Sequence, residues 1–367
     1  MPQNQNILIV IDSLSGGGAE KTMIRLAQVL VNKGHSVHFI PINSSQDYPV
    51  PDSIGVSPLT DISSTKTTTM GNLGRFRAQL KALIGQLSQQ RPFDLILSNL
   101  ENSNYLLAGL ELKNLVIVVH NTVTEELRQE RRRGPFKYFT MRPKKLCMHN
   151  QHLVCVSNGV QQDILEWGKI TPKSLQTIYN PLNQSDLLEA AKLAPNDLPK
   201  EPYIIHVGRF ARTKRHDLLM KMMQDLKSNV KLVCLCSNPK KVMALAKKFG
   251  VESRVIAPGF QPKPYPWIAN AQAMVLVSDF EGLPTVLIES LALGTQVISS
   301  NCPSGPAEIL TGELARNLVP MDQRDRFAEY VDSALNNPVD VSDCEIVRQS
   351  DDQYVAQQYL DLIPKLS

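Results

Sequence analysis

Two glutamates late in the chain have the type and spacing to bind hydroxyl groups. Glu281 follows the apolar run 273–277, and Glu289 lies within a helix expected over 285–293. The apolar run is typical of a buried parallel strand, and Pro284 suits the first turn of a helix. Loop N–H groups and a helix N-terminus beyond a strand end can bind phosphate or sugar oxygens. Both carboxylates can therefore face one polar ligand in a cleft.

Two cations follow another strand-like run, 203–207. Arg209 and Lys214 stand in the loop after this run, with four residues between them in the pattern R-x4-K. The planar fork of arginine and the point charge of lysine can both reach one diphosphate group. A solvated basic loop has the same composition, so the spacing alone leaves both interpretations open.

Three successive glycines, Gly16, Gly17 and Gly18, follow the first apolar run of the chain. A backbone without side chains can approach a diphosphate closely. The loop is not a dinucleotide fingerprint, because Lys21 replaces the third glycine, and it is too short for a P-loop. It is either another kind of phosphate-facing loop or a tight turn without a ligand.

A histidine, His120, ends the apolar run 115–119. A lone histidine is more often structural than a ligand, but parallel sheets bind their ligands at the carboxyl ends of strands. Contact between His120 and a substrate is therefore a hypothesis beside the structural alternative.

The segment 128–145 mixes cations with apolar and aromatic side chains. Its cations include Arg131, Arg132, Arg133, Lys137, Arg142, Lys144 and Lys145, and its apolar members include Phe136, Tyr138, Phe139 and Met141. This mixture is typical of a surface that binds anionic lipid head groups. A solvated loop and a groove for single-stranded nucleic acid are alternatives. We expect no nucleic acid, because the other motifs indicate sugar and phosphate chemistry.

The elements that position these motifs alternate between strand and helix. Strand-like runs occur at 6–11, 36–40, 94–98, 115–119, 153–156 and 176–179, and again at 203–207, 230–236, 254–257, 273–277 and 296–300. A polar segment, 183–200, separates the two series and is the expected linker. The pattern predicts an α/β protein with two Rossmann-like, doubly wound parallel-sheet domains that face across a cleft.

Length and composition agree with two domains. A chain of 367 residues is longer than chains that usually fold around a single hydrophobic core. We expect an N-terminal domain over 1–182, a second domain over 183–343 and a C-terminal segment over 344–367, helical across 344–363. The net charge of +4 is small, and no apolar run is long enough to span a bilayer. The six cysteines match neither a zinc site nor a disulfide framework, which fits a reducing cytoplasm. No Asp-x-Asp pair follows a strand in a metal-ligating context, so we expect no metal.

Together the motifs resemble those of the family 4 retaining glycosyltransferases, which have the GT-B fold. The glycine loop, the R-x4-K pair and the E-x7-E pair occur in the family's order, each after a strand. Residues 301–310 are similar to a segment of members that make bacterial polysaccharides. The resemblance also implies that the C-terminal helix returns to the first domain.

The resemblance implies a role for each motif. Arg209 and Lys214 would neutralise the leaving diphosphate, Glu281 would hold the transferred sugar, and Glu289 would bind the ribose. His120 would contact the transferred sugar, which makes it the fourth expected catalytic residue beside Arg209, Lys214 and Glu281. The other donor-binding positions implied are Gly16, Gly17, Gly18, Phe260, Gln261, Gly282, Leu283, Pro284 and Thr285.

The activity implied is retaining transfer of a hexose-type sugar from a nucleotide sugar without cofactor or metal. UDP is the preferred nucleotide and GDP the second candidate. The implied acceptor is a hydroxyl of a growing lipopolysaccharide, capsule or lipid-linked oligosaccharide. The implied location is cytoplasmic, peripheral on the inner face of the cell membrane, with an anionic membrane surface as partner. A GT-B sugar-nucleotide epimerase and a non-catalytic nucleotide-sugar-binding module are the alternatives.

Overall fold

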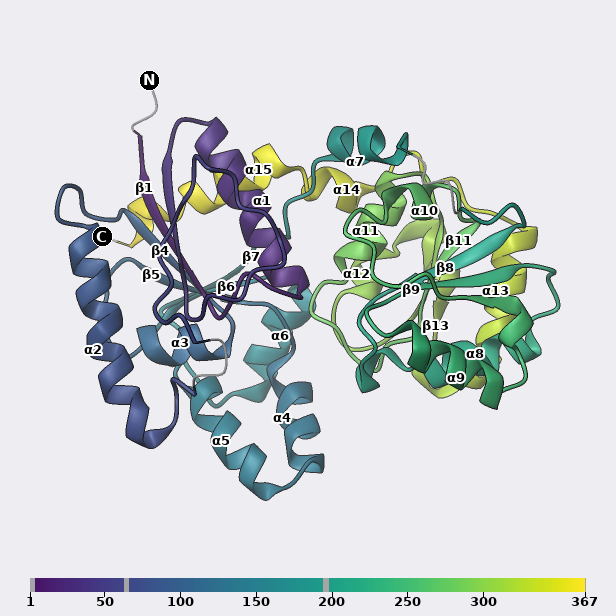
Figure 1. Ribbon diagram of the computed structural model, residues 1–367, viewed down its shortest axis with the longest axis horizontal. Helices are drawn as coiled ribbons and strands as arrows, with labels where there is room; N and C mark the ends of the chain where they lie inside the picture. The colour runs from purple at the N-terminus through teal and green to yellow at the C-terminus, as the bar shows by residue number, and fades with distance from the viewer. Residues whose placement is uncertain (1–3, 63–65, 194–197, 367) are drawn as a thin grey trace. The chain divides into compact units, whose positions relative to one another are not determined.

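The protein, seen here as a computed structural model, forms two compact α/β units (Figure 1). The structure describes residues 4–62, 66–193 and 198–366. The first unit comprises Met1–Pro181 and Asp352–Ser367, and the second comprises Leu182–Asp351. The expected borders were 182/183 and 343/344, so the last stretch of the chain joins the first unit later than expected.

The first unit is built on a seven-stranded parallel sheet in the order β3-β2-β1-β4-β5-β6-β7. Its strands are β1 (Asn6–Ile11), β2 (Ser36–Pro41), β3 (Gly55–Val56), β4 (Leu95–Asn99), β5 (Leu115–Val119), β6 (His152–Cys155) and β7 (Ser174–Thr177). Its α-helices are α1 (Gly18–Asn32), α2 (Met70–Leu87), α3 (Glu101–Leu107), α4 (Val123–Arg132), α5 (Pro135–Leu146), α6 (Asn158–Trp167) and α15 (Asp352–Leu360). The central strands are buried on both faces, which explains their nearly continuous apolar sequence.

The second unit repeats this plan with a six-stranded parallel sheet in the order β10-β9-β8-β11-β12-β13. Its strands are β8 (Tyr203–Val207), β9 (Lys231–Leu235), β10 (Val255–Ile256), β11 (Ala273–Leu276), β12 (Val297–Ser300) and β13 (Leu318–Val319). Its α-helices are α7 (Gln184–Ala191), α8 (His216–Asp225), α9 (Pro239–Lys248), α10 (Tyr265–Ala269), α11 (Thr285–Ala292), α12 (Pro306–Ile309), α13 (Phe327–Asn336) and α14 (Glu345–Gln349). The predicted fold class of two doubly wound parallel sheets is confirmed.

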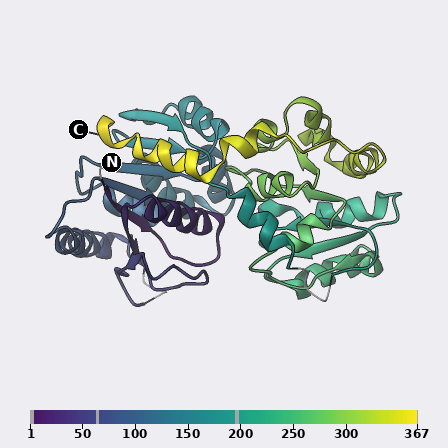
Figure 2. The same ribbon diagram turned by 90° about the horizontal axis from the view of Figure 1, so that it is seen from above.

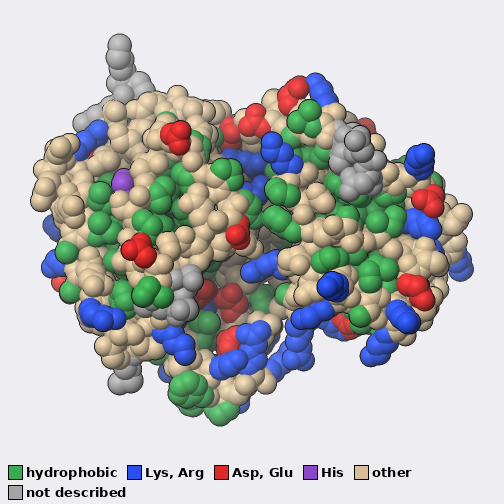
Figure 3. Space-filling view, in the orientation of Figure 1, with side chains coloured by type: hydrophobic (Ala, Val, Ile, Leu, Met, Phe, Trp, Pro, Cys, Tyr) green, Lys and Arg blue, Asp and Glu red, His purple; other side chains and the backbone are tan. Residues whose placement is uncertain are grey.

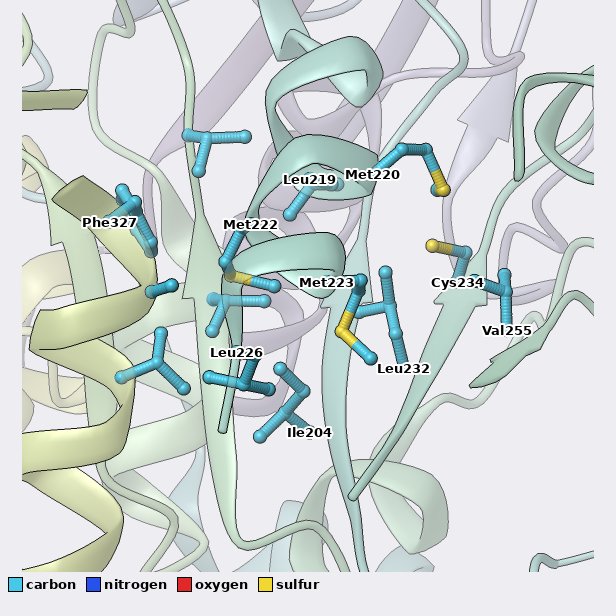
Figure 4. Close-up of a cluster of buried hydrophobic side chains, with 14 of the residues drawn as sticks. Ile204, Leu219, Met220, Met222, Met223, Leu226, Leu232, Cys234, Val255 and Phe327 are labelled. Carbon is cyan, nitrogen blue, oxygen red and sulfur yellow. The ribbon is translucent and has the colours of Figure 1, made fainter. Parts of the chain in front are cut away.

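Side chains from helices and strands fill the core of the second unit (Figure 4). Met222 and Met223 of α8 are buried with Ile204 of β8 and Leu232 of β9, and Phe327 of α13 belongs to the same cluster. Such packing fixes the sheet and therefore the positions of the loops that leave its strand ends.

Two predicted elements differ from the structure. The expected linker, 183–200, contains α7, whose first turn is capped by Asn183 accepting from the backbone N–H of Asp186; residues 194–197 lie outside the described part. The expected helix over 344–363 is divided into α14 and α15, because Ser350 O accepts a hydrogen bond of 2.7 Å from Leu182 N. Only α15 belongs to the first unit, where it packs beside α1 (Figures 1 and 2).

Candidate functional site

Two loops of the second unit meet because the strands that they follow are neighbours. β11 pairs with β8, and the loops after these strands carry Glu281 and Lys214. Lys214 Nζ donates a hydrogen bond of 2.6 Å to Glu281 Oε1, and both side chains are mostly buried. The structure therefore brings together a cation and a carboxylate predicted to act on the same ligand.

A second ion-pair cluster joins the same two loops. Asp279 Oδ1 accepts from Arg215 at 3.1 Å and from Arg324 at 2.7 Å, and Asp279 N donates to Thr213 O at 2.8 Å. Arg215 also donates to both carboxylate oxygens of Asp217, at 3.0 and 2.8 Å, and these bonds raise the pKa of the guanidinium. Arg215 thus joins the two loops through Asp279.

The loop after β12 supports the loop that contains Glu281. Glu281 N donates to Pro303 O at 3.1 Å, and Ser304 Oγ donates to Gly282 O at 2.8 Å. Gly305 has φ +92°, and a Cβ added there would lie 2.4 Å from Pro284 Cδ. A side chain at Gly305 would therefore both strain the backbone and displace the loop.

The other residues predicted to bind the donor take varied positions. Glu289 is buried in α11, and Thr285 is the first residue of the same helix, after Pro284 at its N-cap. The Arg209 side chain is exposed and makes no ion pair or side-chain hydrogen bond with the described residues, so the structure does not join it to Lys214 or Glu281. Phe260 is exposed at the end of another loop, beside Gln261.

Two buried histidines lie beneath the loop of Arg209 and Lys214, and the sequence analysis did not single them out. The rings of His206 and His216 are 5.1 Å apart at 84° to one another. His206 Nδ1 lies 2.9 Å from Val275 O, so it carries a proton. Burial lowers the pKa of His206 to about 3 and that of His216 to about 4. Both rings are therefore neutral and pack below the loop. In the sequence, His206 stands in the apolar run 203–207, but His216 stands between Arg215 and Asp217, so no local pattern indicated that it is buried.

In the first unit, the glycine loop follows β1 and opens α1. Gly16 has φ +78°, and a Cβ at Gly17 would lie 2.0 Å from Glu20 Oε2. Asp12, just before the loop, accepts hydrogen bonds from the backbone N–H groups of Asn102 and Ser103 at the start of α3, at 3.2 and 2.8 Å. Burial raises the pKa of Asp12 to about 6, although these donors oppose the shift. The carboxylate thus fixes α3 next to the loop.

His120 follows β5 and is partly buried. Its Nε2 lies 2.8 Å from Oδ1 of Asn99, the last residue of β4. Burial lowers the pKa of His120 to about 4, against the attraction of the nearby Glu101 carboxylate. The ring is therefore a neutral imidazole at the carboxyl edge of the first sheet.

The basic segment forms two helices, α4 and α5, joined at Gly134 with φ +128°. Its exposed cations include Arg131, Arg132, Arg133, Lys137 and Arg142. Phe136 and Phe139 at the start of α5 are 79% and 67% exposed. Basic and hydrophobic side chains lie next to one another over this end of the helices (Figure 3). We call this surface the basic hairpin tip.

Lys145 and Lys144 do not belong to the basic hairpin tip, which corrects the prediction for the membrane or acceptor patch. Lys145 is only 5% exposed and makes ion pairs with Glu101 Oε1 at 2.9 Å and with Glu126. Lys144 Nζ donates to Asn102 Oδ1 at 2.6 Å. Both lysines instead anchor the base of α5 to α3, because a buried ammonium group needs carboxylate or amide oxygens around it.

Within the described ranges, no group of three or more His, Cys, Asp and Glu side chains is arranged to hold a metal ion. Among helices formed by described residues, none combines the length and the apolar character needed to cross a bilayer.

Known families and proteins match both units. Residues 16–186 match the family described as Glycosyltransferase Family 4, and residues 189–350 match the one described as Glycosyl transferases group 1. A Campylobacter jejuni protein named N-acetylgalactosamine-N,N'-diacetylbacillosaminyl-diphospho-undecaprenol 4-alpha-N-acetylgalactosaminyltransferase is 27% identical over 343 residues, covering 91% of each chain.

Two further comparisons extend this likeness. The lipopolysaccharide 1,6-galactosyltransferase of Escherichia coli is 26% identical over 245 residues, which cover 62% of this chain and 65% of that protein. The crystal structure of HepE from Anabaena in complex with UDP-glucose aligns with a TM-score of 0.69 at 16% identity, covering 99% of this chain and 98% of that one. At this identity the structural match shows a shared fold.

Proposed function

The chain belongs to the family 4 glycosyltransferases of GT-B fold, and we propose that it transfers a hexose-type sugar from a nucleotide sugar with retention of configuration. The observation that carries the proposal is the contact between Lys214 and Glu281 across the ends of β8 and β11. An ammonium group there can bind a diphosphate oxygen, while the carboxylate beside it can accept hydrogen bonds from sugar hydroxyls.

In this proposal the second unit binds the donor. Lys214 and Arg209 stabilise the negative charge that develops on the departing diphosphate, an electrostatic effect that is strong where water is excluded. Glu281 holds hydroxyls of the transferred sugar, and Glu289 accepts from the ribose hydroxyls. The backbone N–H groups of Gly282, Leu283 and Thr285 are additional donors.

The acceptor hydroxyl attacks the face from which the diphosphate leaves. The new glycosidic bond then forms on the side of the broken one, so configuration is retained without a protein nucleophile. A diphosphate oxygen takes the proton of the acceptor hydroxyl. This scheme uses neither a cofactor nor a metal ion.

UDP is the favoured nucleotide, with GDP as the second candidate. Support comes from HepE, whose crystal structure holds UDP-glucose. The Campylobacter relative is named for a diphospho-undecaprenol acceptor and the Escherichia relative for lipopolysaccharide. We therefore propose a lipid-linked oligosaccharide, lipopolysaccharide or capsule chain as the acceptor.

The basic hairpin tip is proposed to dock the enzyme on anionic lipid at the cytoplasmic face of the cell membrane. Exposed phenylalanines next to arginines suit the boundary between lipid head groups and acyl chains. Docking there would bring the enzyme to acceptors that are anchored in lipid.

The test begins with the thermal unfolding of the purified protein in UDP-sugars and GDP-sugars. A nucleotide sugar at a hundred times its Kd should stabilise the folded state by about 2.7 kcal/mol. The donor that stabilises best is then incubated with lipid-linked acceptors in buffer containing a chelator, and the anomeric configuration of the product is read by proton NMR.

Each alternative gives a different result in this experiment. We expect an α-linked product from an α-linked donor, and an inverted product would contradict the retaining scheme. Conversion of the donor to another sugar nucleotide without acceptor would identify an epimerase. Stabilisation by the donor with no turnover on any acceptor would favour a binding module.

A further inference from the structure

Asn99 and His120 form a buried contact between neighbouring strands of the first sheet. Asn99 ends β4, is fully buried, and lies beside β5, which His120 follows. Asn99 Oδ1 lies 2.8 Å from His120 Nε2. A buried amide of this kind can decide which nitrogen of an imidazole carries the proton.

The surroundings of Asn99 determine which end of its amide faces the ring. Asn99 Nδ2 lies 3.4 Å from two backbone carbonyl oxygens, those of Val10 and Leu97. Carbonyl oxygens only accept hydrogen bonds, so the NH₂ group belongs on their side. Oδ1 is then directed at the histidine, and because Oδ1 can only accept, Nε2 must carry a proton.

A neutral imidazole has one N–H, so a proton on Nε2 leaves Nδ1 with a free lone pair. Glu101 of α3 is the charged group that acts on this ring, and burial outweighs its attraction, so the ring is neutral near pH 7. Nδ1 has no hydrogen-bond partner among the described residues and is not one of their fully buried unpaired atoms, so part of its surface stays accessible. An acceptor atom is thereby offered at the carboxyl edge of the sheet.

We propose that Asn99 is a positioning residue that fixes His120 as the Nε2–H tautomer, so that Nδ1 accepts a hydrogen bond from a hydroxyl of the sugar substrate. The inference rests on the proposed function, together with the contact between His120 and the transferred sugar that the family resemblance implies. A site that accepts a hydrogen bond from a substrate hydroxyl discriminates against an analogue that lacks this hydroxyl, because the acceptor atom of the site is then left unpaired in the complex.

The first test reads the tautomer without any substrate. Protein labelled with ¹⁵N-histidine is observed by long-range ¹H–¹⁵N correlation NMR, and a His120→Gln variant identifies the His120 signals among the seven histidines. We expect the Nε2–H pattern for His120, unchanged between pH 6 and pH 8. An Nδ1–H pattern, or a titration in that range, would overturn the inference.

The second test uses two substitutions at Asn99. Asn99→Leu removes the acceptor and should give mixed tautomers and a kcat lower by about ten- to a hundred-fold, the range for one lost hydrogen bond. Its affinity for the free nucleotide should not change, because the substitution lies in the first unit. Asn99→Asp keeps an acceptor oxygen and should retain the Nε2–H contact.

The Asn99→Asp variant also keeps the test decisive if Asn99→Leu unfolds. A carboxylate beside the ring stabilises imidazolium and raises the histidine pKa. Below that raised pKa, Nδ1 becomes protonated and can no longer accept. We therefore expect activity close to wild type at pH 8.5 and a loss of kcat toward pH 6 that the wild type does not show; a pH profile like that of the wild type contradicts the inference.

A deoxy-sugar series connects the tautomer to the substrate. The wild-type enzyme should have low activity on one of the deoxy donors, and His120→Phe should not lower that activity further. On the parent donor, His120→Phe should lower the activity. If His120→Phe lowers the activity on every deoxy donor as much as on the parent donor, Nδ1 has no hydroxyl partner and the inference fails. A wild-type protein that binds no nucleotide sugar would instead count against the proposed function.

Discussion

At the scale of single residues, the contact between Lys214 and Glu281 lets each group hold the other in place before the donor binds. The pair is mostly buried, so each charge keeps a partner when water is displaced. Loss of Lys214 would leave a carboxylate facing the diphosphate, which adds repulsion to the loss of attraction. We expect Lys214→Ala to slow transfer by about ten- to a hundred-fold or more, from a charge-assisted contact worth roughly 1.5–3 kcal/mol.

Steady-state kinetics of Lys214→Ala, Lys214→Met and Arg209→Ala test this prediction. Arg209→Ala should also reduce turnover, although its side chain is exposed without ligand. Lys221→Ala is the matched control, since Lys221 is an exposed lysine of α8 in the same unit. Wild-type turnover of Lys214→Ala would remove Lys214 from the donor site.

The buried histidines give the stability of the protein a defined pH dependence. The pKa of His206 is lowered to about 3 and that of His216 to about 4, whereas an unfolded histidine titrates near pH 6.5. As pH falls below about 6.5, the unfolded chain takes up protons that the folded protein excludes. The free energy of unfolding should therefore fall by up to about 1.4 kcal/mol per pH unit for each of the two histidines.

Urea denaturation at pH 7.5, 6.0 and 5.0 measures this slope. His216→Phe should reduce it by the contribution of one histidine. Met223→Leu, which changes a buried side chain of the same helix without removing a titratable group, is the control and should keep the wild-type slope. A slope unaffected by His216→Phe would show that the ring is protonated in the folded protein.

The partnerships that the sequence did not predict are those between residues far apart in the chain. The spacing of Lys214 and Glu281 within two strand-end loops was enough to expect them near one ligand. Arg324 lies far from Asp279 in sequence, and no local pattern predicts the ion pair between them. The same holds for Asn99 and His120, whose contact depends on the pairing of β4 with β5.

At the scale of elements, strands buried on both faces were predictable, because their apolar runs are short and bounded by polar residues. The helix α5 was not predictable from the sequence, because Pro143 lies inside it and its cations interrupt the apolar spacing that is typical of a helix. The division between α14 and α15 was also missed, because it depends on the hydrogen bond from Leu182 N to Ser350 O.

The basic hairpin tip should bind anionic vesicles through its outer end. Arg131, Arg132 and Arg133 attract lipid phosphates, and the phenylalanines enter the interface. Binding to vesicles containing phosphatidylglycerol should weaken as salt rises, because charges are screened within about a nanometre at physiological ionic strength. Replacing all three arginines by serine should weaken vesicle binding at every salt concentration, as measured by co-sedimentation.

A control variant separates the hairpin tip from the charge of the whole protein. Replacing Lys240, Lys247 and Lys248 of α9 by serine removes the same formal charge from the second unit and should leave vesicle binding nearly unchanged. Phe136→Ser should reduce binding even at low salt. Equal loss in both triple variants, or binding that salt does not alter, would leave α4 and α5 as a solvated hairpin.

At the scale of the whole molecule, the chain leaves the first unit after Pro181 and returns to it at Asp352. The returning helix, α15, packs beside α1 and buries Val355, Ala356 and Tyr359. Residues from the C-terminus therefore complete the core of the unit in which the chain begins. We therefore expect the first unit to need α15 for its stability, whereas the second unit is continuous in sequence.

Tyr359→Ala should destabilise the first unit and spare the second. The ring of Tyr359 is fully buried, and removing a buried aromatic ring costs about 3–5 kcal/mol. Hydrogen exchange read by mass spectrometry should show faster exchange in α1 and β1, with unchanged exchange in β8 and β11 and unchanged affinity for the nucleotide. Tyr354→Ala is the control on the same helix, because the Tyr354 side chain is 54% exposed. If exchange in β8 and β11 rises as much as in β1, the two units unfold together and α15 stabilises the molecule as a whole.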